Sequence, residues 1–189
     1  MERDLIAEPG TKFTYSGGGI IILGEILRNA SGMNIDDFSM KYLFEPLGID
    51  STIWFRYDNG NIATDGSLEL TPRDMLKLGV TYLNKGIWNG KRIIPDAWVL
   101  KSSNVYNNNY PIRAPIEDSG KNGYRYTWWI SDFIHDGSKI SMFRASGWGG
   151  QSIMVFPKLD MVVVFTGGNY ASHSSLYTII RQHVLRAIK

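Results

Sequence analysis

The spacing of apolar residues changes partway along the chain, and this change constrains the fold more than any other feature of the sequence. Up to about Ser103 the apolar residues recur at helical intervals, whereas between Tyr124 and Thr166 the spacing tends toward every second residue. A final stretch, Ser174 to Ile188, returns to helical spacing. Because no segment repeats and the two patterns are not interleaved, the sequence predicts an α+β fold.

The first half of the chain carries several helix boundaries. The apolar stretch Ile20 to Ala30 is typical of a mostly buried helix, and Asn34 can cap a second helix after it. Residues 50–70 are expected to form a long loop. Thr71-Pro72-Arg73-Asp74 then places a capping hydroxyl, a proline at the first helical position and an acid at the third, which predicts a helix to about Asn84.

Turn residues divide the rest of the chain. Asn89-Gly90 lies between two short apolar arms, which predicts a hairpin with a type I′ turn. A short helix is expected from Pro95. Four strands with turns between them are then expected as an antiparallel meander, over Tyr124–Ser131, Lys139–Arg144, Gln151–Phe156 and Met161–Thr166.

Composition argues against several classes of partner and cofactor. The chain has no cysteine, which removes disulfides, thiolate nucleophiles and Cys-ligated zinc together. Its three histidines, His135, His173 and His183, lie far apart without metal-ligand spacing, so neither a metal nor another cofactor is predicted. Acidic residues outnumber basic ones up to residue 70 and the reverse holds afterwards. The basic residues are scattered singly, however, so nucleic-acid binding is not expected.

The sequence contains neither a predicted membrane span nor a predicted export signal. No apolar run reaches the roughly 18 to 20 residues that span a bilayer, so no membrane span is expected. The residues Met1-Glu2-Arg3-Asp4 carry acids where a secretory leader would be basic, so no signal peptide is expected in this chain.

Two short segments could carry chemistry. Tyr15 precedes a glycine-rich turn and a helix start, where positive charge at the helix end would favour a phenolate that accepts protons. Ala145-Ser146-Gly147-Trp148-Gly149 places small residues on a strand, which lets a ligand or another backbone approach. Taken alone, each segment is better explained by structure, with Tyr15 as a packing aromatic and Ser146 as a turn residue.

Taken together, six ordered segments resemble the C-terminal part of the serine β-lactamase-like hydrolases, the family of class C β-lactamases, penicillin-binding proteins and esterases. The segments cover nearly the whole chain. They are Glu8-Pro9-Gly10 with Phe13-x-Tyr15-Ser16; Leu23-Gly24 with Gly32; Phe44-Glu45-Pro46-Leu47-Gly48; Leu70-Thr71-Pro72-Arg73-Asp74-Met75 with Leu78-Gly79 and Gly86; Gly147-x-Gly149-Gly150-Gln151; and Pro157-x-x-Asp160-x-Val162-Val163-Val164.

The resemblance implies a β-lactamase/transpeptidase-like fold and assigns roles to particular residues. In that family a Ser-x-x-Lys nucleophile acts with a Tyr-x-Asn motif and a Lys-Thr-Gly-like strand. Here Tyr15 falls on the Tyr, the proton shuttle, but Gly17 stands where the family has Asn. Ser146 and Gly147 fall on Thr-Gly as substrate-binding residues, Ala145 replaces the Lys, and the Trp148 N–H would donate to the oxyanion.

The Ser-x-x-Lys motif itself is absent. No serine is followed by lysine three residues later, and the nearest match, Ser141 to Arg144, lies on an expected strand and ends in an arginine that cannot act as a base. The resemblance therefore implies a single partial domain over residues 1–189, mainly helical in 1–122, with strands and a last helix in 123–189. We expect the isolated chain to form no acyl-enzyme.

Alternatives remain open at this stage. In the family, N-terminal strands pair with the last strand, so Met161–Thr166 is expected to be an open edge that recruits a homodimer partner, a swapped element or an upstream nucleophile-bearing polypeptide. The ligand would be an amide, an ester or peptidoglycan-like. Six Trp and ten Tyr, including Trp128-Trp129, equally suit a non-catalytic module that binds glycan, peptidoglycan or β-lactam, and an inactive fragment is a third interpretation. Family members are commonly exported in bacteria, but the sequence does not specify a compartment.

Overall fold

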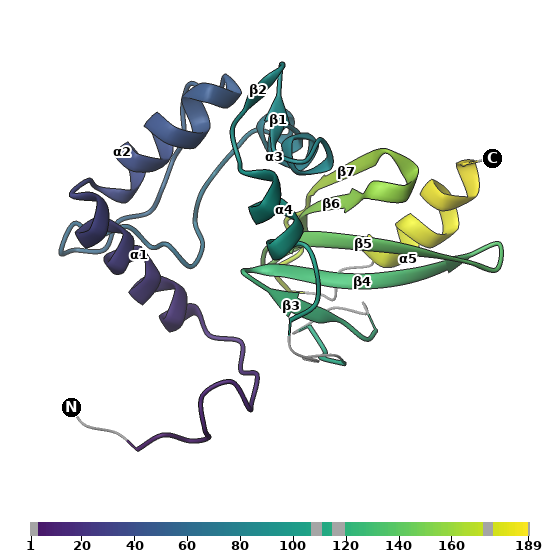
Figure 1. The fold of residues 1–189 in the computed structure, drawn as a ribbon, viewed down its shortest axis with the longest axis horizontal. Coiled ribbons are helices and arrows are strands. Elements are labelled where there is room, and N and C mark those ends of the chain that lie inside the picture. The colour runs from purple at the N-terminus through teal and green to yellow at the C-terminus, as the bar shows by residue number, and fades with distance from the viewer. Residues whose placement is uncertain (1–3, 107–110, 115–119, 172–175, 189) are drawn as a thin grey trace.

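A five-stranded antiparallel sheet organises the second half of the chain in this computed structural model, which describes residues 4–106, 111–114, 120–171 and 176–188 (Figure 1). Each strand pairs with the next along the chain, so the sheet is a simple meander. The strands are β3 (Gly123–Arg125), β4 (Trp128–His135), β5 (Ser138–Ser146), β6 (Gln151–Phe156) and β7 (Met161–Thr166). With helices before and after it, the sheet confirms the α+β prediction.

One predicted strand is wrong. Tyr124–Ser131 was expected to be continuous, but Tyr126 and Thr127 adopt φ angles of 45° and 72° and reverse the chain between β3 and β4. Two consecutive residues with positive φ make the turn that matches the twist of a two-stranded hairpin. Arg125 consequently pairs with Trp128 across that hairpin.

The helices precede the sheet, except for the last one. α1 and α2 lie at the opposite end of the molecule from α5, and α3 lies between them and the sheet (Figure 1). The helical elements are α1 (Gly17–Ser31), α2 (Ile35–Ser39) with two further turns to Leu47, α3 (Pro72–Leu83), α4 (Asp96–Ser102) and α5 (Leu176–Ile179) with two further turns to Ala187; a short hairpin, β1 (Ile87–Trp88) and β2 (Lys91–Arg92), separates α3 from α4. None of the described helices is long and apolar enough to cross a bilayer.

The predicted start of α3 and the predicted turn between β1 and β2 are confirmed, whereas Asn34 precedes α2 without a side-chain capping hydrogen bond. The Thr71 hydroxyl accepts a hydrogen bond from the Asp74 N–H at 3.2 Å and donates one to the Asp74 carboxylate at 2.6 Å, which fixes the start of α3. Asn89 and Gly90 both have positive φ, at 46° and 77°, as a type I′ turn requires. Residues 51–70 form a long irregular segment with two isolated bridges.

The prediction that the first helix is mostly buried is wrong. Ser16 caps α1 by accepting from the Gly19 N–H, but Ile22, Leu23 and Ile26 are 55–63% exposed. α1 approaches residues 62–64 at Gly24, where an added Cβ would lie 2.6 Å from the Thr64 side chain. No described element covers the face that carries the three exposed side chains.

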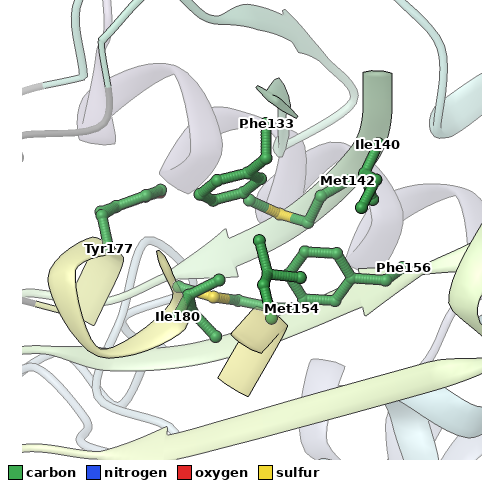
Figure 2. Packing of buried hydrophobic residues seen from close by; sticks show 8 residues of the cluster. Phe133, Ile140, Met142, Met154, Phe156, Tyr177 and Ile180 are labelled. Atoms are coloured by element: carbon green, nitrogen blue, oxygen red, sulfur yellow. The ribbon is translucent and has the colours of Figure 1, made fainter. Parts of the chain in front are cut away.

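Two hydrophobic clusters hold the sheet between helices. On one face Phe133, Met142, Met154 and Phe156 pack against Tyr177 and its neighbours in the last helix (Figure 2). On the other face Trp128, Phe143, Ile153 and Val155 pack against α3. The sheet is thus covered on both faces, while β7 has a described neighbour only along its β6 edge.

Candidate functional site

Aromatic rings attach the segment before α1 to the β3–β4 hairpin. Tyr15 stacks on Trp129 with ring centroids 5.6 Å apart and meets Tyr124 edge-on at 6.0 Å. Phe13 contacts the same two rings, at 5.1 Å from Tyr124 and 6.2 Å from Trp129. Such pairs each stabilise by about 0.5–1.5 kcal/mol beyond area burial. Residues 13–15 are therefore held on the sheet although Tyr15 is half exposed.

The Tyr124 ring, which packs against Tyr15, is uncharged. Burial raises the pKa of Tyr124 to about 12, and the neighbouring phenol of Tyr15 adds to the rise because two phenolates would repel each other. Near neutral pH the Tyr124 ring is neutral. The arrangement gives Tyr15 an apolar, aromatic surface on one side and solvent on the other.

A buried arginine connects this aromatic group to the next strand. Arg144 pairs with Trp129 across β4 and β5, is fully buried, and has its guanidinium carbon 5.7 Å from the Trp129 ring and 5.1 Å from the Tyr177 ring. Its Nη1 donates to the Ser131 hydroxyl at 2.9 Å and to the Asn122 side-chain oxygen at 3.1 Å. The guanidinium is thus fixed in position by rings and hydrogen bonds together.

Ser146 is held by the same arginine. The Arg144 Nε–H donates to the Ser146 hydroxyl oxygen at 3.1 Å, since the two residues share one face of β5. Because a lone pair of the Ser146 oxygen accepts this bond, the hydroxyl can still donate its own proton to another acceptor. Arg144 therefore orients Ser146 as a hydrogen-bond donor.

The end of β5 has one paired edge and one without a described strand beside it. Toward β6, Ser146 pairs with Ser152 and the Gly147 N–H donates to the Gln151 carbonyl at 2.9 Å. Toward β4, the pairing ends at Arg144. Residues 145–147 therefore have no described strand paired with them on the β4 side, and unpaired strand edges are where extended ligands can add a strand.

Trp148 lies in the turn that follows. Its side chain is 67% exposed, and within the described part of the chain its N–H has no hydrogen-bond partner. The next residue, Gly149, has φ of 94°, and a Cβ there would lie 2.7 Å from the Tyr170 ring. Only glycine fits at that place, so the turn is fixed immediately after the Trp148 N–H.

At Gly17 a distant acid fills the place of a side chain. A Cβ on Gly17 would lie 2.8 Å from Asp65 Oδ2, so the Asp65 carboxylate lies against the first turn of α1. α1 has no acidic residue of its own in that turn. A carboxylate there interacts favourably with the positive end of the helix dipole. The absence of a side chain at Gly17 thus makes room for the Asp65 carboxylate.

The structure thus brings Tyr15 and Ser146 into one connected group through Trp129 and Arg144, places Trp148 in the adjoining turn, and places Gly17 beside Asp65. Alternation along β5 could have identified Arg144, which lies two residues before Ser146. Nothing in the local sequence indicates Asp65, because it is brought to Gly17 by the long segment between the helices.

No metal site is found among the described residues, and a hollow elsewhere in the fold lies apart from the predicted site residues. No group of three described His, Cys, Asp or Glu side chains could hold a metal ion. A hollow of about 300 Å³ lies between α1 and the segment 56–64, but none of the predicted site residues lines it. Its two arginines are already ion-paired, Arg28 with Glu25 and Arg56 with Asp36.

Comparison with known sequences places this geometry in a family. The profile of the family described as Beta-lactamase matches residues 2–183. A protein of uncharacterized function from Alkalihalophilus pseudofirmus is 22% identical over 86% of this chain and 54% of its own length. The 6-aminohexanoate-dimer hydrolase of Paenarthrobacter ureafaciens is 22% identical over 81% of this chain and 38% of its own.

Solved structures show the same fold. A Bacillus anthracis protein assigned as a 6-aminohexanoate-dimer hydrolase superposes with a TM-score of 0.78 at 23% identity, over 97% of this chain and 45% of that one. An octameric penicillin-binding protein homologue from Pyrococcus abyssi gives 0.73 at 21% identity, over 96% and 44%. The chain spans about half the length of these relatives.

Proposed function

Because the chain belongs to the beta-lactamase family, we propose that it forms the substrate-binding part of a serine hydrolase site that acts on an amide or ester bond. The observation that carries the proposal is the connection from Tyr15 through Trp129 and Arg144 to Ser146. It links the phenol of Tyr15 to the hydroxyl of Ser146, which is oriented as a donor. Ser146 lies at the end of β5, where a ligand can pair with the strand. A linear amide is the first substrate class to test, since two of the relatives are named for 6-aminohexanoate dimer.

Each residue has a role in the proposed reaction. A serine hydroxyl from a nucleophile segment attacks the carbonyl carbon while Tyr15 shuttles its proton, and the Trp148 N–H donates to the oxygen that becomes negative. When the bond to the leaving group breaks, Tyr15 returns the proton to that group, and water then hydrolyses the acyl-enzyme. Ser146 donates to the substrate and Gly147 lets it approach the strand.

Two positions depart from the family pattern in this proposal. Asp65 supplies a polar group beside Gly17, where the family has the Asn of Tyr-x-Asn. The family's strand lysine is Ala145 here, and Arg144 acts from the other face through the Ser146 hydroxyl. Both changes keep a polar group in the proposed site but deliver it from a different backbone position.

Residues 1–189 alone are proposed to bind without turning substrate over. An oxyanion donor contributes about 10²–10³ in rate, and a triad-type site without its nucleophile retains only about 10³–10⁴ over water. No serine of the chain has a lysine three residues later. The proposed nucleophile therefore comes from a polypeptide segment other than these residues.

The experiment combines intact mass with a titration. Incubation with a fluorophosphonate and with penicillin should leave the mass unchanged, whereas 6-aminohexanoate dimer should change tryptophan fluorescence saturably, because Trp129 and Trp148 border the proposed site. Ser146→Ala should weaken that binding, and Ser138→Ala, at the far end of β5, serves as the matched control. A stoichiometric serine adduct would overturn the lack of a nucleophile, and a flat titration would overturn the binding role.

A non-catalytic binding module is the second candidate. The Tyr15 ring is 52% exposed and is backed by Phe13, Tyr124 and Trp129, so its open face suits sugar rings as well as amide chains. The same titration with a muropeptide separates the two proposals. Tighter binding of the muropeptide than of any amide, unaffected by Ser146→Ala, would favour the binding module.

We also propose that the chain associates with another polypeptide, either a second copy or the one that carries the nucleophile. The β7 edge and the exposed face of α1 are the surfaces available for this. Open strand edges recruit partners, and the similar Pyrococcus abyssi protein is octameric. Light scattering at tens of micromolar should show a species larger than a monomer, and a strict monomer would contradict self-association.

A further inference from the structure

A cluster of aromatic and basic side chains lies on the surface where α4 meets the turn between β3 and β4. We call it the α4 patch, and its members are Trp98, Lys101, Tyr106, Arg125 and Tyr126. Its three aromatic side chains remain 40–43% exposed. None of the five residues belongs to the proposed hydrolase site.

The patch is built around the Tyr126 ring. The Trp98 ring lies 4.7 Å from it between centroids. Lys101 Nζ lies 5.3 Å from the same ring and the guanidinium carbon of Arg125 lies 5.6 Å from it. Arg125 also lies 5.0 Å from the Tyr106 ring. Since both cations are within 6 Å of one ring, a single ligand can meet both.

The positive charge of the patch is not balanced by acids among the described residues. No ion pair within that part of the chain involves Lys101 or Arg125. The Arg125 Nε is buried and has no hydrogen-bond partner there, so a ligand would meet this guanidinium at its terminal nitrogens.

The backbone at Tyr126 adds a second, independent indication. Tyr126 and Thr127 occupy the two turn positions with positive φ, where Asn-Gly is the preferred pair. Positive φ is unfavourable for an aromatic residue and more so for β-branched Thr127. The chain therefore presents the Tyr126 ring against local backbone preference, a pattern that occurs at functional surfaces.

We propose that the α4 patch binds an anionic polysaccharide through its carboxylates and its sugar rings. Two cations beside one ring suit carboxylates carried on successive sugars, and exposed Trp and Tyr rings suit the apolar faces of those sugars. An acidic peptide would satisfy the charges but would leave the aromatic faces unused. The inference does not depend on the proposed hydrolase function.

The probe is a set of short galacturonate oligomers. Their binding to the whole chain is measured by calorimetry at low and high salt. Binding should weaken with salt because the charges are exposed, and a neutral galactose oligomer of the same length should bind at least about fivefold more weakly. Lys101→Ala with Arg125→Ala should reduce galacturonate affinity at least about fivefold. Trp98→Ala should reduce it severalfold, and Lys91→Ala, in the β1–β2 hairpin, should not.

The outcomes separate this proposal from its alternatives. Equal affinity for the neutral oligomer, or no effect of the double substitution in a variant with unchanged circular dichroism, would overturn it. If polyglutamate binds as tightly as galacturonate and Trp98→Ala has no effect, the surface binds acidic peptide and the polysaccharide proposal is wrong. Ser146→Ala, which tests the hydrolase site, should leave galacturonate binding unchanged, so the two proposals can fail separately.

Discussion

Replacing Gly79 with alanine should destabilise the protein, because α3 meets the sheet at this residue without room for a methyl group. A Cβ at position 79 would lie 2.5 Å from Cγ1 of Val162 and 2.9 Å from Cγ2 of Ile153. Real Cβ atoms do not approach other carbons so closely, so something must move. Both neighbours are β-branched with restricted χ1 angles, and they project from the paired strands β6 and β7.

The sign of the effect follows from two opposing magnitudes. Alanine is favoured over glycine inside a helix by up to about 1 kcal/mol. Overpacking a filled interior costs about 1–3 kcal/mol. We therefore expect a net loss of up to about 2 kcal/mol in the free energy of unfolding. In α1 a Cβ at Gly19 would meet only the Ser16 side chain, at 3.8 Å or more, so Gly19→Ala should be neutral or stabilising.

Urea unfolding followed by tryptophan fluorescence measures the effect. The midpoint should fall for Gly79→Ala and hold or rise for Gly19→Ala, with unchanged slopes. Adding Val162→Ala to Gly79→Ala should recover part of the loss, since it removes the methyl groups that collide. If Gly79→Ala stabilises the chain as Gly19→Ala does, α3 does not pack on β6 and β7 as described.

Three further predictions concern the core, a helix cap and pH. Phe156 is fully buried beside Phe133, so Phe156→Ala should lower the free energy of unfolding by about 3–5 kcal/mol. Phe55 is 59% exposed, so Phe55→Ala should lower it far less in the same urea assay. Thr71→Ala should lower the free energy of unfolding by about 1 kcal/mol through loss of the α3 cap, and Thr71→Ser should restore it. Stability should fall between about pH 10 and pH 12, because the unfolded chain releases the Tyr124 proton near pH 10 whereas the raised pKa keeps it on the folded protein to about 12. Tyr124→Phe should reduce that loss and Tyr42→Phe should not, as measured by urea midpoints across this pH range; equal slopes in both variants would contradict the burial of Tyr124.

Features that depend on local chemistry could be predicted from the sequence. The Thr71 cap and the Asn89-Gly90 turn are set by hydrogen bonds and φ preferences within four residues, so both were identified without a structure. The strand order also followed, since successive strands joined by short turns pair with each other.

Features that depend on distant contacts could not be predicted. Tyr126-Thr127 contains neither glycine nor asparagine, so nothing local marked the turn that divides the expected first strand. The apolar pattern of Ile20–Ala30 shows that the helix can be buried but not what covers it, and the prediction of burial was wrong for that reason. Asp65 reaches Gly17 across the fold, which a linear pattern cannot reveal.

The position of Ser146 follows from the core rather than from a loop. One guanidinium donates from Nε to Ser146 and from Nη1 to Ser131 and Asn122, while its face lies between the Trp129 and Tyr177 rings. A lysine has a single ammonium and could not donate in these fixed directions at once. Because Tyr177 belongs to the last helix and Tyr15 stacks on Trp129, Arg144 joins the C-terminal helix and the segment before α1 to β5. A change in packing at either place should therefore alter how Ser146 presents its proton, even though neither lies at the strand end.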